Sequence, residues 1–174
     1  AIVRKELGFR TIFNVLGPLT NPASASAQVL GVFDVKWVQP LAQVLFGLGC
    51  EQAMVVHGSD GLDEITLTGE SHVAELRNGE ISNYSLDPRK LGFKTCSSVD
   101  LKGGTPEENA VMIQNILNGE IGPKRDIVVL NSAAAIYVAG KVNSIEQGIQ
   151  CAIDSIESGK ARNKLEDLCR ITCS

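Results

Sequence analysis

The feature that most constrains the fold is a strand–helix–strand pattern in the first third of the chain. Residues 28–33 form a short β-prone run, and residues 53–57 form a second, apolar one. Between them, residues 37–48 place apolar side chains at the spacing of one helix face. Strands joined by a helix pair in parallel, so the pattern predicts an α/β domain with a mainly parallel sheet flanked by helices.

The sequence that follows has the pattern of antiparallel strands. Residues 64–68 and 72–76 are short β-prone runs, and Asn78-Gly79 is a typical hairpin turn between residues 72–76 and the run at 81–86. We therefore expect an antiparallel meander that packs on the parallel sheet.

Helix patterns dominate the last third of the chain. Thr105 and the proline that follows it are typical of a capped helix start, and residues 126–138 are apolar and rich in alanine. Ser144 opens another capping pattern. Near the beginning, residues 7–22 start as a helix and continue as a turn, with Gly17-Pro18 and Asn21-Pro22 as the expected helix terminators.

Composition excludes several classes of protein. The 174 residues carry a net charge of -4 with scattered lysines and arginines, which argues against a nucleic-acid-binding surface. No apolar run is long enough to span a membrane, so no membrane partner is expected. The five cysteines are odd in number and form no Cys-x-x-Cys pair, which favours free thiols in a reducing compartment such as the cytoplasm.

Two adjacent carboxylates, Asp63 and Glu64, are the strongest candidates for a functional site. They follow the apolar run at residues 53–57 in a loop that also contains Asp60, which could provide a third carboxylate for a metal. Ligands of open α/β sheets bind at the carboxyl ends of the strands, and Mg²⁺ prefers oxygen ligands. The spacing alone allows a Mg²⁺ site but favours an ordinary polar loop with an Asp-Gly turn.

Three further features allow either a binding role or a structural one. Arg10 lies among apolar residues, where its guanidinium can grip a carboxylate or phosphate, or its stem can cover apolar surface. Residues 102–105 include two glycines before a predicted helix, but they lack the full phosphate-binding patterns, which favours a plain loop. His57 closes a strand, and we expect it to make a structural hydrogen bond. No residue is nominated as a general base or other catalytic group.

Three segments carry a resemblance to a known family: residues 4–22 (RKELGFRTIFNVLGPLTNP), residues 55–65 (VVHGSDGLDEI) and residues 131–140 (NSAAAIYVAG). Together they resemble the anthranilate phosphoribosyltransferases, and the resemblance covers at least residues 4–165. The first segment is long and specific, so chance is a poor explanation for the match.

The resemblance implies an enzyme of tryptophan biosynthesis. Such an enzyme transfers the phosphoribosyl group of phosphoribosyl pyrophosphate to the amine of anthranilate and uses Mg²⁺ as cofactor. By the same resemblance, Arg10 would bind the carboxylate of anthranilate, and Asp63 and Glu64 would hold the metal on the diphosphate. The implied fold is an α/β domain with a small helical domain, shared with pyrimidine-nucleoside phosphorylases, and the implied full-length enzyme is a homodimer.

The same resemblance predicts that the chain is incomplete. The family's glycine-rich diphosphate loop and its Lys-His-Gly-Asn segment would lie upstream of Arg4. Residues 1–174 are therefore expected to be a single α/β domain from the C-terminal part, without the helical domain and the first part of the α/β domain, and to be inactive alone. Two alternatives stay open: a pyrimidine-nucleoside phosphorylase-like enzyme, against which residues 10–22 argue, and a non-catalytic nucleic-acid-binding relative, against which the charge argues.

Overall fold

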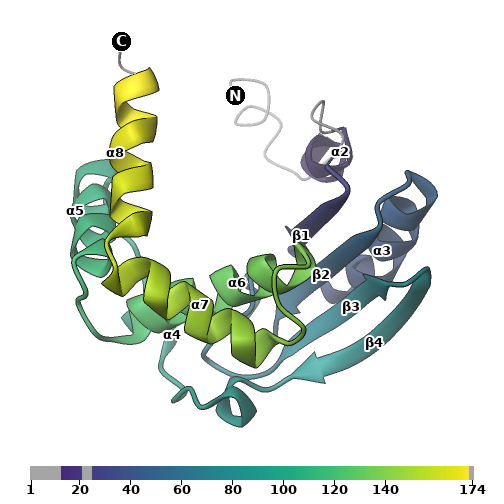
Figure 1. Ribbon diagram of the computed structural model, residues 1–174. Helices are drawn as coiled ribbons and strands as arrows, with labels where there is room; N and C mark the ends of the chain where they lie inside the picture. The colour runs from purple at the N-terminus through teal and green to yellow at the C-terminus, as the bar shows by residue number, and fades with distance from the viewer. Residues whose placement is uncertain (1–12, 21–24, 173–174) are drawn as a thin grey trace.

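The computed structural model describes residues 13–20 and 25–172, which form a four-stranded sheet covered by helices (Figure 1). The strand order is β1-β2-β3-β4, so each strand lies beside its neighbour in sequence. β1 pairs with β2 in parallel, and the other two pairings are antiparallel. The strands are β1 (Ala27–Gly31), β2 (Gln52–Gly58), β3 (Ser71–Arg77) and β4 (Glu80–Leu86).

Helices cover both faces of this sheet. One helix, α3, packs on β2 and β3, while α6 packs on β1 and β2 from the other side, with α7 against its outer surface (Figure 1). None of the helices in the described parts of the chain could cross a membrane. The helices are α2 (Phe13–Leu19), η1 (Val35–Trp37), α3 (Val38–Gly47), η2 (Pro88–Leu91), α4 (Ser98–Leu101), α5 (Pro106–Leu117), α6 (Pro123–Val138), α7 (Ile145–Glu157) and α8 (Lys160–Thr172).

The core lies on both faces of β2, because successive side chains of a strand point to opposite sides. Ala53 and Val55 are buried with the inner face of α3. Met54 and Val56 are buried on the other face, where Leu130 of α6 meets them. A strand that is buried on both faces reads as a continuous apolar run, which is why the sequence revealed it.

The predicted strand–helix–strand unit and the hairpin are confirmed. Asn78 and Gly79 both have positive φ angles, 53° and 79°, as the two-residue turn of a type I′ hairpin requires. The α/β class holds, but the sheet of the described residues is mixed rather than mainly parallel. A two-residue turn can join only antiparallel neighbours, whereas the parallel pair β1–β2 needs the crossover through α3.

The meander differs from the prediction in two ways. It does not pack on the parallel sheet, because β3 and β4 extend that same sheet beyond β2. Residues 64–68, predicted to be a strand, form a loop. Side chains take up the backbone N–H groups there: Ile65 donates to the side chain of Asn131, and Thr66 donates to Ser71 Oγ.

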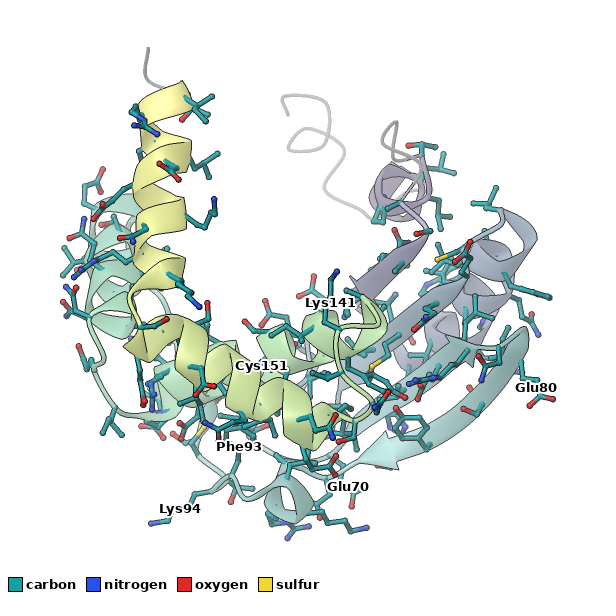
Figure 2. The ribbon with its side chains drawn as sticks, viewed as in Figure 1. Glu70, Glu80, Phe93, Lys94, Lys141 and Cys151 are labelled. Carbon is teal, nitrogen blue, oxygen red and sulfur yellow. The ribbon has the colours of Figure 1, made fainter. Side chains whose placement is uncertain are left out.

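The predicted helix starts at residues 105 and 144 are confirmed, with one difference in detail. Thr105 and Glu108 form a reciprocal capping box at the start of α5. Ser144 Oγ accepts from the N–H of Gln147, but Gln147 Oε1 accepts from Asn143, one residue before the cap. The described cysteines are free thiols, and Cys151 lies exposed on α7 (Figure 2).

Of the two expected terminators, Gly17-Pro18 does not end the first helix, since α2 continues through Pro18 to Leu19, and Asn21-Pro22 lies outside the described residues. A proline in the last turn of so short a helix removes only one backbone hydrogen bond. Thr20 ends the helix instead, because both its N–H and its hydroxyl donate to the carbonyl oxygens of Leu16 and Gly17.

Candidate functional site

The two candidate carboxylates lie beyond the carboxyl ends of β1 and β2. β2 ends at Gly58, and the loop that follows contains Asp63 and Glu64, both exposed to solvent. The opposite end of the strands can be located in Figure 2 by Glu80, at the start of β4. The register of β2–β3–β4 places Glu80 at the level of the start of β2, far along the sheet from the acids.

Gly31, the last residue of β1, lets the loop after β2 pass directly over the end of β1. A Cβ atom at this position would collide with the backbone carbonyl of Asp63. Any residue other than glycine would therefore force the backbone of either β1 or the acidic loop to move. The acids are thus placed against the end of the neighbouring strand by a backbone-to-backbone contact.

Replacing Gly31 by alanine should lower the free energy of unfolding by about 1–3 kcal/mol, because the new methyl group overpacks a rigid backbone contact. Gly47→Ala is the matched control: nothing lies within 4 Å of a Cβ there, and Gly47 is in α3. Because alanine favours helix over glycine, the control should be neutral or slightly stabilising. Urea unfolding of both variants measures the difference, and equal midpoints would contradict the contact.

The loop between Gly58 and Leu62 closes on itself. The N–H of Gly58 donates to the carbonyl oxygen of Leu62 at 2.8 Å, and the N–H of Gly61 donates to that of Gly58 at 2.9 Å. Gly61 has a φ of 92°, a left-handed conformation that glycine adopts without strain. The chain therefore leaves β2, makes a tight turn and returns at Leu62, immediately before the acids.

Asp60 holds this turn and does not join the two acids as a third metal ligand. Its Oδ2 accepts hydrogen bonds from the hydroxyls of Thr66 at 2.7 Å and Thr68 at 2.8 Å, and its Oδ1 accepts from the N–H of Leu62 at 3.2 Å. Burial opposes ionisation of Asp60, but these hydrogen bonds outweigh it and hold the pKa below its ordinary value. The described residues do not group Asp60 with the two acids as a third metal ligand, and its oxygens are already hydrogen-bonded.

On the far side of the acids, the chain is held by α6. The side-chain amide of Asn131 accepts from the N–H of Ile65 at 3.0 Å and donates to its carbonyl oxygen at 2.8 Å. Ile65 itself is fully buried. The two acids therefore lie on a short segment that is anchored at Leu62 on one side and at Ile65 on the other.

Asp63 and Glu64 could provide two carboxylate ligands to a divalent cation whose other ligands are water and substrate oxygens. Within residues 13–20 and 25–172, no hydrogen bond or ion pair engages either carboxylate. Partial burial and, to a lesser extent, the neighbouring charge of Asp63 raise the pKa of Glu64. No group of three or more potential ligands occurs in that part of the chain, so Mg²⁺ would depend on water and substrate oxygens for the rest.

His57 makes the structural hydrogen bond that its position at the end of a strand predicted. Its Nδ1 lies 2.7 Å from the carbonyl oxygen of Val32, one residue beyond β1. Since that oxygen can only accept, Nδ1 carries the proton in this contact. The ring therefore ties the ends of β1 and β2 together beside the acidic loop.

The glycine loop at residues 102–105 offers few free amides for a phosphate. The N–H of Gly104 donates to Asn109 Oδ1 at 2.8 Å, and the N–H of Thr105 donates to Glu108 Oε2 at 2.7 Å. These are the contacts of a capped helix start, and they support the plain-loop interpretation.

Arg10, the predicted carboxylate-binding residue, lies outside the described residues. Two residues that shape the site were not singled out from the sequence, Gly31 and Asn131. No local sequence pattern indicated Gly31, because glycine is required there only by contact with a loop more than 30 residues away. Asn131 opened the third segment of the family resemblance, which was its only signal.

Known proteins resemble this chain in sequence and in fold. Residues 1–162 match a family described as the glycosyl transferase family, a/b domain. The chain is 55% identical over 172 residues to the anthranilate phosphoribosyltransferase of Petrotoga mobilis, and 57% identical over 171 residues to that of Acetivibrio thermocellus. These alignments cover 99% and 98% of this chain but 50% of each relative, so the chain spans about half the length of the curated relatives it matches.

Solved structures show the same fold. The anthranilate phosphoribosyltransferase of Thermus thermophilus superposes with a TM-score of 0.87 at 47% identity, over 96% of this chain and 49% of that one. The Saccharomyces cerevisiae enzyme, in complex with PRPP and Mg, superposes with a TM-score of 0.83 at 29% identity, over 94% of this chain and 48% of that one. With residues 1–162 of the chain matched and its fold shared with these enzymes, the chain belongs to the glycosyl transferase family, as its a/b domain.

Proposed function

We propose that this chain is the C-terminal part of an anthranilate phosphoribosyltransferase and supplies that enzyme's Mg²⁺-binding carboxylates. The observation that carries the proposal is the anchored loop that presents Asp63 and Glu64, without protein partners in the described residues, at the carboxyl ends of β1 and β2. Ligands of open α/β sheets bind at that edge. The names of the relatives support the reaction, and the yeast complex with PRPP and Mg supports the cofactor.

In the proposed reaction, the bond between the anomeric carbon and the pyrophosphate breaks while the amine of anthranilate attacks that carbon. Mg²⁺, when bound, would stabilise the negative charge that grows on the departing pyrophosphate. Asp63 and Glu64 would hold it through carboxylate oxygens. The anchored turn would keep both acids in place before substrate arrives, so that little loop ordering remains to be done on binding.

Arg10 is the residue we propose for the other substrate. A guanidinium can hold the carboxylate of anthranilate through two parallel hydrogen bonds and so orient its amine toward the anomeric carbon, which is a positioning effect. A yeast relative is known in complex with 4-fluoroanthranilate, which carries the same carboxylate. We further propose that the full-length enzyme is a homodimer and that the family's diphosphate loop lies in the part of the enzyme outside this chain.

The full-length enzyme that contains this chain should convert anthranilate and phosphoribosyl pyrophosphate to phosphoribosyl anthranilate in a Mg²⁺-dependent reaction. The loss of anthranilate fluorescence measures the rate. The isolated chain, residues 1–174, should show no turnover above background, because it carries only one side of the proposed site. Phosphorolysis of pyrimidine nucleosides by the full-length enzyme, with no consumption of anthranilate, would contradict the proposal.

A further inference from the structure

One side chain connects the acidic loop to the helix layer of the domain. Asn131, on α6, makes three hydrogen bonds, two of them to the backbone of Ile65, which is 66 residues away in sequence. It accepts from the N–H of Ile65 and donates to its carbonyl oxygen, the same pair of bonds that a neighbouring β-strand would supply. Ile65 directly follows Glu64.

The amide of Asn131 is oriented by its own helix. Its Nδ2 also donates to the carbonyl oxygen of Ile127, one turn earlier in α6, at 3.0 Å. Both Nδ2 hydrogens and Oδ1 are therefore in use, and turning the amide over would set donor against donor at Ile65. Because α6 packs on β1 and β2, the hydrogen bonds from Asn131 fix the position of Ile65 relative to the sheet.

Only the two acids lie between the anchored residues. Leu62 is bound to Gly58 through its carbonyl oxygen, and Ile65 is buried and bound to Asn131. The side chains of Asp63 and Glu64 have no hydrogen bond or ion pair within the described ranges, so backbone anchors decide where the two carboxylates stand. Two adjacent negative charges repel each other, and a segment free to relax would separate them.

We propose that Asn131 is a positioning residue that holds the backbone of Ile65 and thereby presents Asp63 and Glu64 together to Mg²⁺. This inference rests on the proposed function, because it concerns the metal of that same site. The chemistry at position 131 is specific. Alanine would remove both hydrogen bonds to Ile65. Aspartate would keep an acceptor for the N–H of Ile65, but it would face the carbonyl oxygen of Ile65 without a donor and add a third negative charge near the acids.

The test uses the full-length enzyme with Asn131→Ala, Asn131→Asp and, as matched control, Ser132→Ala. Ser132 is the next residue on α6, partly buried, and its side chain makes no hydrogen bond within the described residues. Alanine is a good helix former, so α6 should persist in both alanine variants, and circular dichroism checks this. Asn131→Asp keeps one of the two bonds to Ile65 and provides a second folded variant should Asn131→Ala be unstable.

Four quantities are measured: Mn²⁺ affinity by electron paramagnetic resonance with phosphoribosyl pyrophosphate present, the Mg²⁺ concentration for half-maximal rate, the KM for anthranilate, and hydrogen exchange at the amide of Ile65. Asn131→Ala should weaken the metal affinity by about 10-fold, as loss of a group that orients metal ligands typically does, whereas the added carboxylate of Asn131→Asp attracts the cation and should offset part of that loss. The KM for anthranilate should change much less. The amide of Ile65 should exchange faster in Asn131→Ala, while Ser132→Ala should match the wild type in every measurement.

Two outcomes overturn the inference. Faster exchange at Ile65 with unchanged Mn²⁺ and Mg²⁺ dependence would show that Asn131 only ties the loop to the helix, while leaving the proposed function intact. If the wild-type enzyme bound no Mn²⁺ that depends on Asp63 and Glu64, the proposed metal site and the role of Asn131 would fall together. Asp63→Ala and Glu64→Ala enzymes, titrated in parallel, separate these two results.

Discussion

Replacing Asp63 and Glu64 together by alanine in the full-length enzyme should lower kcat by about 100-fold, because the charge stabilisation that a catalytic metal supplies is worth several kcal/mol. The Mg²⁺ dependence of the remaining activity should be weaker, since the carboxylates that hold the metal on the diphosphate are gone. Stability should change by only about ±0.5 kcal/mol, because both side chains are exposed and without partners in the described residues. Steady-state rates at several Mg²⁺ concentrations, with urea unfolding in parallel, test both expectations.

The chain offers a control with the same change in charge. Glu51 and Glu80 are exposed acids at the amino ends of β2 and β4, at the opposite end of the strands from Asp63 and Glu64. Replacing both by alanine should leave kcat and the Mg²⁺ titration as in the wild type. If the Asp63 and Glu64 double variant also behaved like the wild type, the two acids would be an ordinary solvated loop.

Replacing Arg10 by alanine should raise the KM for anthranilate by roughly 30-fold or more, since losing one partner of a desolvated charge pair costs about 2–5 kcal/mol. The KM for phosphoribosyl pyrophosphate should change far less, because the proposed partner of Arg10 is the carboxylate of anthranilate. Initial rates with one substrate varied at a time separate the two constants.

Arg10→Lys tests the geometry of this contact. An ammonium keeps the charge but cannot form two parallel hydrogen bonds with a carboxylate, so the variant should recover only part of the lost affinity. Arg170→Ala removes an exposed arginine from α8 and serves as the control for net charge. Equal increases in both KM values for Arg10→Ala would contradict its assignment to anthranilate.

Much of the secondary structure could be predicted from the sequence because its causes are local. The apolar run of β2, the helical spacing of α3, the Asn78-Gly79 turn and the cap at Thr105 depend on residues close together in the chain. The same holds for Asp63 and Glu64, which lie in the loop after a buried strand. Their place at the carboxyl ends of the strands follows from the α/β pattern alone.

Interactions between distant residues decided what the sequence could not show. Residues 64–68 have β-prone side chains but form a loop, because Asn131 and Ser71 satisfy backbone groups that a neighbouring strand would otherwise have bound. Asp60 looks like a metal ligand in sequence, yet the fold places two threonine hydroxyls against it.

The requirement for glycine at position 31 has the same origin. It arises only when the loop after β2 crosses the end of β1. The sequence by itself determined which elements form and where the acids lie along the chain, because short-range periodicity and turn chemistry suffice for that. Tertiary structure decided which polar groups are already engaged and which remain free for a ligand, because each such contact joins residues that meet only after the sheet and α6 have packed together.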